Sequence, residues 1–310
     1  MTDPTGSPSP SNQFDLKRYL AKQRQCVDEA LERLLNGKHF EGSSLREAMR
    51  YSIKAGGKRL RPILCLASTH AVGGKEEDAL PVACALEMIH TYSLIHDDLP
   101  AMDDDALRRG KPTCHKAFGE ATAILAGDAL LTFAFQLLAD HALLQDRQYH
   151  GQWLNTMALI ARAAGYEGMI EGQMRDIAAE GRELSADQLE HLHLLNTGAL
   201  ISASIHTGAI IGGADEKSTA RLTQFARHIG LAFQVTDDIL NEIGDPLIMG
   251  KAAGTDHMRG KNTYPALMGL NAAERKASDL IAQALRSIDI FDTKSDPLRA
   301  LARYVIERRR

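Results

Sequence analysis

Five aspartates lie within nine positions and directly follow an apolar stretch: Asp97, Asp98, Asp103, Asp104 and Asp105. His90, Ser93 and Asp97 are spaced i, i+3 and i+7, so a helix would place them on one face. A carboxylate on a buried face is costly unless a cation compensates its charge. Carboxylate oxygens without a neighbouring Cys or His cluster favour Mg²⁺ over zinc. The stretch therefore predicts a magnesium site that includes Asp97, while Pro100 disturbs the helix and leaves the second ligand open among the later aspartates.

Two arginines, Arg108 and Arg109, follow the aspartate cluster. Taken alone, the aspartates fit a solvated acidic helix end equally well. Adjacent guanidinium groups favour a polyanionic substrate such as a diphosphate, because their paired N–H groups match phosphate oxygens. The combination therefore favours a metal–diphosphate site over a solvated helix end.

A second acidic pair, Asp237 and Asp238, lies in the segment GLAFQVTDDILN. Asp237 follows Phe233 by four residues, which predicts that it lies on the inward apolar stripe with Gln234 beside it. Exposed acids near a helix end would explain this pair by itself. Two inward-facing acidic sites in one chain favour a shared metal–diphosphate cluster.

Cations stand in two glycine-rich segments. Lys58, Arg59 and Arg61 follow two glycines, whose backbone N–H groups can approach an anion closely. Lys251 and Lys261 lie in a long Gly-rich segment, where a mobile lid over a charged substrate would be useful. A basic turn and an ordinary surface loop explain the two segments equally well when each is considered alone.

The elements that must position these residues are predicted to be helices. The segment SSLREAMRYSI opens with a capping box between Ser44 and Glu47, and ELSADQLEHLHLL repeats it with Ser185 and Gln188. Apolar residues recur at three- and four-residue intervals, and alternating runs of strand type are absent. The pattern predicts an all-α chain.

Composition narrows the class of protein further. We predict a disordered Pro/Ser-rich leader over residues 1–13 and a single domain over residues 14–310, because no composition shift or repeat divides the rest. The net charge of -4 gives no sign of a nucleic-acid partner. Four separated cysteines and the absence of an 18-residue apolar run indicate a cytoplasmic protein without a membrane span.

In order and spacing, the segments resemble the trans-isoprenyl diphosphate synthases, and most closely the bacterial farnesyl diphosphate synthases. The resemblance runs from about Leu45 to the C-terminus. It is carried by GGKRLRP, HTYSLIHDDLPAMDDDALRRGKPTCH, ILAGDALL, GQMRD, NTGALI, GLAFQVTDDILN, GKNTYPALMGL and LARYVIERRR. It implies an isoprenoid synthase fold, with ten or more helices around a deep central cavity, and a homodimer.

The resemblance also implies roles for individual residues. Asp97 and Asp103 would ligate two Mg²⁺ ions and Asp237 a third, with Mn²⁺ as a possible substitute. The isopentenyl diphosphate would be held by Gly57, Lys58, Arg61, His90 and Arg109. The allylic diphosphate would be faced by Arg108, Thr197, Gln234, Lys251 and Lys261. Gln173 and Asp176 would line the inner wall near the reacting carbons.

The implied reaction is a head-to-tail condensation of isopentenyl diphosphate with dimethylallyl or geranyl diphosphate. In the family, the residues four and five positions before the first aspartate limit the product length, and here these are Ser93 and Tyr92. An aromatic residue at Tyr92 resembles the enzymes that stop at farnesyl diphosphate. A geranyl or geranylgeranyl diphosphate synthase, or an impaired homologue that only binds isoprenoid diphosphates, remains the alternative.

Three positions depart from the family pattern, all on the allylic side. Asn196 replaces a lysine expected to contact the allylic diphosphate, Asn241 replaces the last aspartate of the second motif, and Thr236 precedes that motif. A charge-assisted hydrogen bond contributes about 1.5–3 kcal/mol, so losing the lysine would weaken binding by roughly 10- to 150-fold. The sequence therefore predicts an active enzyme with weakened allylic binding.

Overall fold

The computed structural model describes residues 14–36, 42–243 and 261–307. The predicted leader over residues 1–13 and the predicted lid residue Lys251 lie outside these ranges.

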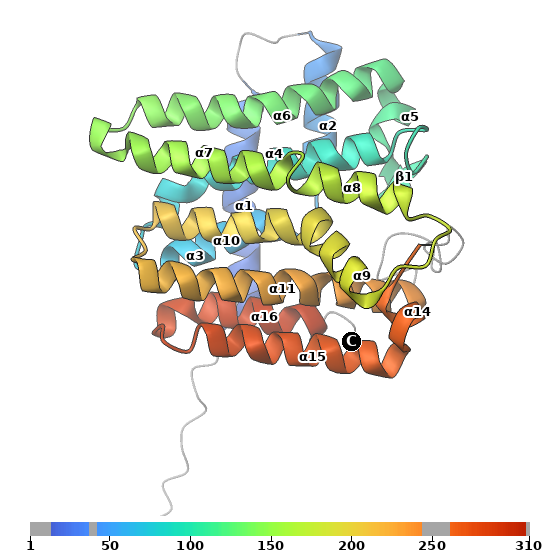
Figure 1. The fold of residues 1–310 in the computed structure, drawn as a ribbon. Coiled ribbons are helices and arrows are strands. Elements are labelled where there is room, and N and C mark those ends of the chain that lie inside the picture. Colours follow the sequence, from blue (N-terminus) through green and yellow to red (C-terminus); the bar gives the residue numbers. More distant parts are fainter. Residues whose placement is uncertain (1–13, 37–41, 244–260, 308–310) are drawn as a thin grey trace, which may run out of the picture.

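The described residues form twelve α-helices of eight or more residues, and the predicted all-α fold is confirmed (Figure 1). These helices are α1 (Leu16–Leu35), α2 (Ser44–Lys54), α3 (Leu60–Ala71), α4 (Glu76–Asp97), α6 (Glu120–Leu143), α7 (His150–Ala164), α8 (Met169–Ala178), α9 (Ala186–His193), α10 (Ala199–Ile211), α11 (Glu216–Ile243), α15 (Leu270–Ser287) and α16 (Asp296–Glu307). The shorter elements are α5 (Cys114–Phe118), α14 (Tyr264–Met268), the 3₁₀ turns η2 (Arg147–Tyr149) and η4 (Thr293–Ser295), the π-helical turn η3 (Leu194–Gly198), and the antiparallel pair β1 (Leu107–Arg108) and β2 (Lys111–Pro112).

Of the two predicted capping boxes, one is present in the structure and the other is not. At α9, Ser185 and Gln188 form the predicted capping box. At α2 the predicted box is wrong, because the N-cap is Ser43 and Ser44 is already the first helical residue. Ser43 makes no side-chain capping bond. Two serines stand side by side here, and the prediction chose the second of them as the N-cap, one position too late.

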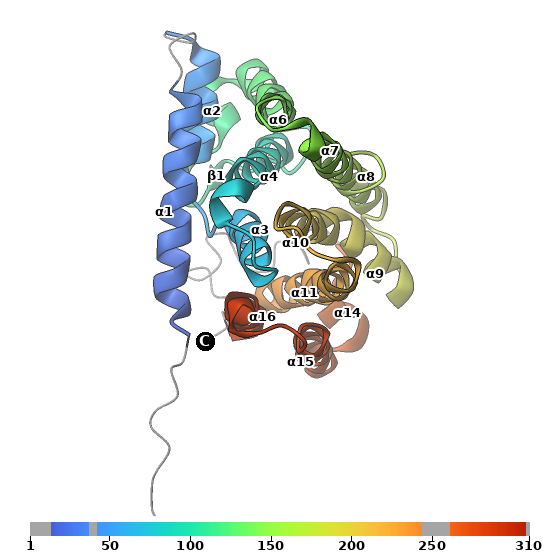
Figure 2. The same ribbon diagram turned by 90° about the vertical axis from the view of Figure 1, so that its left-hand side faces the viewer.

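The hydrophobic core consists of two clusters that meet on α3 and α10. One cluster joins α1, α2, α4, α6 and α7, and the other joins α3, α9, α10, α11, α15 and α16. On α3, Cys65 and Leu66 belong to the first cluster, whereas Ile63 and Leu64 belong to the second. Seen along their axes, α3 and α10 lie between α4 and α11 (Figure 2). The two aspartate-bearing helices are therefore held on either side of a shared central pair.

A glycine allows this central pair to pack closely. A Cβ at Gly208 of α10 would lie 2.1 Å from the backbone oxygen of Cys65 on α3. A side chain at this position would push the two helices apart and disturb both core clusters.

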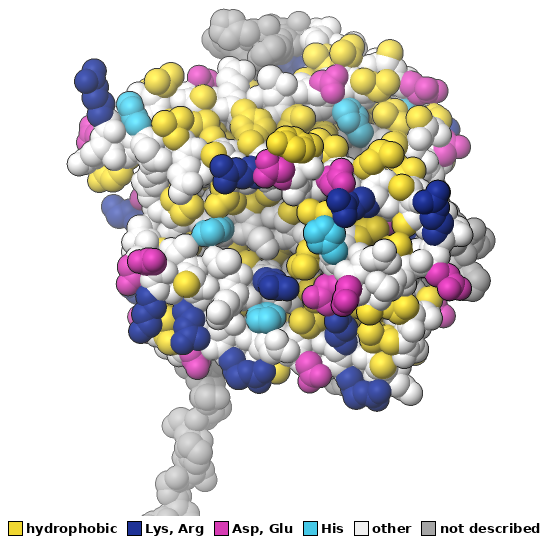
Figure 3. All heavy atoms as spheres, in the orientation of Figure 1, with side chains coloured by type: hydrophobic (Ala, Val, Ile, Leu, Met, Phe, Trp, Pro, Cys, Tyr) yellow, Lys and Arg dark blue, Asp and Glu magenta, His cyan; other side chains and the backbone are white. Residues whose placement is uncertain are grey.

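Two helical stretches, Glu120–Leu143 and Ala186–Ile211, are long and apolar enough to cross a membrane by length and composition alone. Core helices pass the same test, and 50% of the apolar window in the second stretch is buried inside the fold. The first stretch is α6, which exposes Ile124, Leu125 and Leu143. Apolar side chains are spread over the upper part of the face shown in Figure 3, where α6, α7 and α8 lie.

Candidate active site

The C-terminal end of α4 opens into a polar cavity of about 200 Å³. Its lining comes from α4 and the following loop, α8, α9, η3, α11 and the segment before α14: Asp97, Asp103, Gln173, Asp176, Leu192, His193, Asn196, Gln234, Asp238, Lys261, Asn262 and Thr263. The fold thus brings the first aspartate cluster, part of the second motif and one predicted lid lysine to one cavity.

The first two predicted metal ligands are close neighbours at this cavity. The backbone N–H of Asp103 donates to the backbone oxygen of Asp97 over 2.8 Å, which folds the loop back towards the helix end. Burial raises the pKa of Asp97 to about 7, and the charge of Asp103 adds to this rise. Two desolvated carboxylates that repel each other favour a shared cation.

The metal ligands are not gathered in advance. Within the three described ranges, no three His, Cys, Asp or Glu side chains form a group that could hold a metal ion by itself. A site that completes its coordination with oxygens of a bound diphosphate fits this arrangement, because Mg²⁺ commonly bridges carboxylates and substrate phosphates. The residues present therefore fit divalent ions that bind together with substrate.

The two aspartates of the second acidic motif, on α11, have different surroundings. Asp238 is 3% exposed, accepts from Gln234 Nε2 over 2.9 Å and from the backbone N–H of Tyr264 over 3.0 Å. Asp237, its neighbour, is partly buried, and its negative charge acts on Arg61 of α3. Asp237 therefore faces the cationic side of the site, while Asp238 is a structural anchor that the sequence did not indicate.

Thr197 completes a short chain of hydrogen bonds with this anchor. Its hydroxyl donates to Gln234 Oε1 over 2.9 Å, while the amide of Gln234 donates to Asp238. Two of the five residues predicted to face the allylic diphosphate are therefore in direct contact, although 37 positions separate them in the chain.

Arg108 is held by a carboxylate that the prediction left without a role. Its Nε lies 2.7 and 2.8 Å from the two carboxylate oxygens of Asp98, and Asp105 lies 3.6 Å from a terminal nitrogen. Asp98 is 3% exposed. Successive residues of a helix point about 100° apart, so Asp98 faces a different direction from Asp97. Asp98 therefore fixes Arg108 beside the cavity.

The predicted isopentenyl cations gather around the start of α3 and the middle of α4. Burial lowers the pKa of His90 well below its ordinary value, and the charges of Arg61 and Arg109 lower it further. Burial also lowers the pKa of Arg61, and Arg109 adds to this effect, whereas Glu87 and Asp237 oppose it. The Nε of Arg61 is buried without a hydrogen-bond partner. Such a set of neighbouring cations suits an anionic ligand.

Gly57 is needed where Arg109 passes the backbone. Its φ of +135° is rare for other residues, and a Cβ would lie 2.7 Å from the Arg109 guanidinium carbon. Lys58 is exposed, with its Nζ 6.0 Å from the centre of the Tyr304 ring on α16. Gly57 and Arg109 thus come together as predicted, whereas Lys58 lies at the outer edge of the group.

Two further charged residues support this group. Arg59 begins α3 in a left-handed conformation and donates to Glu87 over 2.7 Å and to Asp28 over 2.8 Å. Glu87 is 2% exposed, and its second carboxylate oxygen has no hydrogen-bond partner. Glu87 precedes His90 by one helical turn, so the spacing could have placed it beside the cations.

The wall opposite α4 is formed by paired polar side chains of α8. Lys261 Nζ contacts Asp176 Oδ2 over 2.9 Å, and the amide of Asn196 donates to Gln173 over 3.1 Å. Asn196, which replaces the expected lysine, is thus engaged with a neutral partner. Of the two lysines expected to face the allylic diphosphate, Lys261 lies at the cavity, and Lys251 lies outside the described residues.

Tyr92, the predicted chain-length residue, is 5% exposed, and its hydroxyl has no hydrogen-bond partner. Burial raises the pKa of Tyr92 to about 12, and the charge of Asp97 contributes. The ring makes an edge contact with His96, with 5.7 Å between ring centres. Ser93 donates to the backbone oxygen of His90 over 2.9 Å. Tyr92 is thus a fixed apolar body close to the aspartate end of the cavity.

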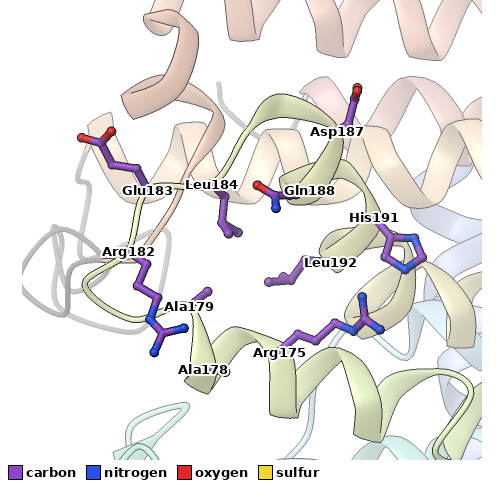
Figure 4. A pocket seen from close by; sticks show the side chains of 10 residues that line it. All are labelled: Arg175, Ala178, Ala179, Arg182, Glu183, Leu184, Asp187, Gln188, His191 and Leu192. Carbon is purple, nitrogen blue, oxygen red and sulfur yellow. The ribbon is translucent and has the colours of Figure 1, made fainter.

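A larger hollow of about 600 Å³ lies between α8 and α9, where side chains from both helices border an open space (Figure 4). Its charged residues are exposed, and Arg175 is paired with Glu171 over 2.7 Å. Leu192 lines both this hollow and the polar cavity. We place the chemistry in the smaller cavity, because it combines Asp97 of α4 and Asp103 of the following loop with Asp238 of α11. The predicted third ligand, Asp237, is not among the residues that line this cavity.

Known proteins share this arrangement over nearly the whole chain. The polyprenyl synthetase family profile matches residues 43–295. The chain is 47% identical over 297 residues to a farnesyl diphosphate synthase of Geobacillus stearothermophilus, covering 96% of this chain and 99% of the relative. It is 47% identical over 304 residues to the large subunit 1 of a chloroplastic heterodimeric geranylgeranyl pyrophosphate synthase of Arabidopsis thaliana, covering 97% of this chain and 81% of that protein.

A solved structure agrees with these sequence matches. The apo structure of a FPP/GFPP synthase from Zymomonas mobilis superimposes with a TM-score of 0.83 at 38% identity, over 94% of this chain and 98% of that one. The chain therefore belongs to the polyprenyl synthetase family and is a prenyltransferase.

Proposed function

We propose that the protein condenses isopentenyl diphosphate with dimethylallyl and then geranyl diphosphate to give farnesyl diphosphate. The observation that supports this most strongly is the single polar cavity shared by Asp97, Asp103, Gln234 and Lys261. Residues of these types can bind divalent ions and a diphosphate together, next to a separate group of cations around Arg61.

In this proposal the two diphosphates bind on opposite sides of α4. Arg61, His90, Arg109 and Lys58 hold the isopentenyl diphosphate, with Gly57 leaving room for Arg109. Thr197, Gln234, Lys261, Lys251 and Arg108 face the allylic diphosphate. Holding both substrates in one orientation replaces a collision by an intramolecular step and accounts for much of the rate.

Divalent ions, which we take to be three Mg²⁺ ligated through Asp97, Asp103 and Asp237, would supply charge stabilisation for the departing diphosphate. The allylic C–O bond then ionises while Arg108 and Lys261 lie beside the growing negative charge. The isopentenyl double bond attacks the allylic carbon, and a proton passes to the released diphosphate. Water would have to be excluded from the cavity once the substrates are bound, because it would otherwise capture the allylic cation.

Product length is proposed to depend on Tyr92. The ring is buried and within the electrostatic influence of Asp97, which supports a position beside the growing tail. Replacing it by alanine (Tyr92→Ala) should shift the main product from C15 to C20 or longer, because a large buried side chain is removed. Ser93→Ala removes only a hydroxyl from the other position that limits product length, so it should leave C15 as the main product. C15 retained in Tyr92→Ala would remove this residue from the proposal.

One assay tests the whole proposal. Purified protein is incubated with Mg²⁺, isopentenyl diphosphate and either dimethylallyl or geranyl diphosphate, and the products are sized. A C15 product is expected. A main product of C10 or C20 would favour a geranyl or geranylgeranyl diphosphate synthase, and the match to the geranylgeranyl pyrophosphate synthase subunit motivates the C20 alternative. Binding of allylic diphosphate without any product would favour an impaired homologue.

We further propose a cytoplasmic homodimer. The apolar helix α6 exposes Ile124 and Leu125, and α8 exposes Ile170, Met174 and Ile177. Exposed apolar side chains in this number suit a protein–protein interface. Sedimentation equilibrium should give twice the chain mass, and Leu125→Glu should shift the protein towards the monomer. A monomeric wild-type protein would contradict the dimer.

A further inference from the structure

His193 lies at the junction of three elements of the site and has no role in the proposal above. It is the last residue of α9, and the π-helical turn η3 begins directly after it. This turn carries Asn196 and Thr197 to the cavity. Inserted π-helical turns are uncommon and often occur at functional sites, because the extra residue changes which side chains face inward.

Two neighbouring helices pack closely against the backbone of this turn, because each has a glycine at the point of contact. A Cβ at Gly172 of α8 would lie 2.4 Å from the backbone nitrogen of Asn196. A Cβ at Gly230 of α11 would lie 3.2 Å from Cα of Gly198. The backbone of η3 is therefore fixed between α8 and α11, and a contact to α11 beyond the Thr197–Gln234 bond can fix its orientation further.

His193 supplies such a contact with the buried carboxylate of α11. The residue is 6% exposed, and its Nε2 lies 3.5 Å from Asp238 Oδ2, a polar contact without hydrogen-bond geometry. This nitrogen is buried and has no hydrogen-bond partner in the described structure. The same oxygen accepts the backbone N–H of Tyr264 at the start of α14. The imidazole also packs against the Tyr264 ring, with 5.4 Å between ring centres and 30° between planes.

We infer that His193 is a positioning residue that, through Asp238, locks η3, α11 and the start of α14 into one unit. The lock orients Gln234 and Thr197 and fixes the chain three residues after Lys261. Asp238 accepts from Gln234 of its own helix and from the backbone of Tyr264, and it lies against the His193 ring. In this arrangement Asp238 acts as an anchor and not as a metal ligand. The consequence for catalysis rests on the proposed position of the allylic diphosphate.

The test compares His193→Phe, His193→Gln and His191→Phe. Phenylalanine keeps the packing on Tyr264 and removes the nitrogen, whereas the glutamine amide can still donate to Asp238. His191 is an exposed residue of the same helix and serves as the matched control. Thermal unfolding is measured for all three. Should His193→Phe fail to fold, Asp238→Asn removes the same interaction from the other partner and takes its place in the comparison.

His193→Phe should raise the allylic KM about tenfold, with the isopentenyl KM and the Mg²⁺ concentration for half-maximal rate unchanged, because a contact to a charged group is lost. Hydrogen exchange should become faster for the peptide that contains the Tyr264 amide. His193→Gln should restore both properties, and His191→Phe should match the wild type. Equal changes in both Michaelis constants, or unchanged Tyr264 exchange, would overturn the inference.

Asp238→Asn separates anchoring from metal binding. If Asp238 anchors, this change and His193→Phe should be non-additive in the allylic KM, since both remove one interaction. A large rise in the Mg²⁺ requirement of Asp238→Asn alone would overturn the inference in favour of metal ligation. Exchange at Tyr264 and calorimetric binding of geranyl diphosphate do not require turnover. An inactive wild type with these two effects intact would therefore contradict the proposed function and leave the inference standing.

Discussion

The side of the site proposed to bind isopentenyl diphosphate, around Arg61, and the side proposed to bind the allylic diphosphate, around Gln234, are built differently. Around Arg61 the side chains themselves carry the charges. The cations Arg61 and Arg109 lower the pKa of His90, and the carboxylates of Glu87 and Asp237 raise the pKa of Arg61. Around Gln234, amides and hydroxyls bond to one another and to a single buried carboxylate. The residues around Arg61 thus provide charge, whereas the residues around Gln234 provide side chains in fixed orientations.

This difference has a consequence for substitutions. A residue of the cation group acts through its charge, so any substitution that displaces this charge should weaken binding of the diphosphate. A position in the hydrogen-bonded group acts through orientation, so Asn196 can replace a lysine and still find a partner in Gln173. The allylic side can therefore absorb a departure from the family pattern without losing its architecture.

The largest effect is expected where the two sides meet. Asp97→Asn should lower kcat about 10²- to 10³-fold, the range found when one group that stabilises transition-state charge is removed. Steady-state kinetics with saturating substrates and Mg²⁺ measure the effect. Asp104→Asn, an exposed aspartate of the same cluster, is the control and should change the rate little. A fully active Asp97→Asn would break the link between the two sides.

On the isopentenyl side, Gly57→Ala should raise the isopentenyl KM about 10- to 150-fold, because the new Cβ displaces the Arg109 guanidinium and its charge-assisted bonds. The allylic KM should not change. Gly56→Ala has a similarly positive φ of +87° but no atom within 4 Å of the new Cβ, so it controls for backbone strain. Equal losses in both variants would attribute the effect to strain alone.

On the allylic side, Asn196→Lys should lower the allylic KM by about tenfold. The gain lies at the lower end of the range for a charged hydrogen bond, because the lysine loses rotamer freedom and the Gln173 contact disappears. Asn196→Gln, which lengthens the side chain without adding charge, serves as the control. An unchanged allylic KM would refute the account of weakened allylic binding.

The smallest effect concerns pH. The pKa of Asp97 in the ion-free protein is raised to about 7, so the carboxyl gains a proton as the pH falls through this value. Metal binding requires the ionised form, and the apparent Mg²⁺ affinity should fall about threefold from pH 7.5 to pH 6.5. Calorimetric titration with Mg²⁺ and pyrophosphate at both values measures this, and proton release on binding should be detectable. Affinity that is independent of pH would indicate that Asp97 is already ionised.

Sequence alone determined the all-α class, the family and which residues carry charge. Helical periodicity and local caps are short-range properties, so they survive in a linear pattern, as the capping box at Ser185 shows. The spacing of His90, Ser93 and Asp97 likewise placed them along one helix, because its geometry is fixed. Local patterns failed by one residue at Ser44, where two serines compete for the cap position.

Only the tertiary structure decided which charged residues are partners. Asp98 pairs with Arg108, Arg59 with Glu87, and Asp238 with Tyr264, and each pairing joins segments that no sequence period connects. Neighbouring aspartates look alike in a sequence, but burial and distance separate a residue that faces the cavity from one that holds a helix. The environment of a charge depends on long-range packing, and the chain order does not contain this information in a form that local rules can extract.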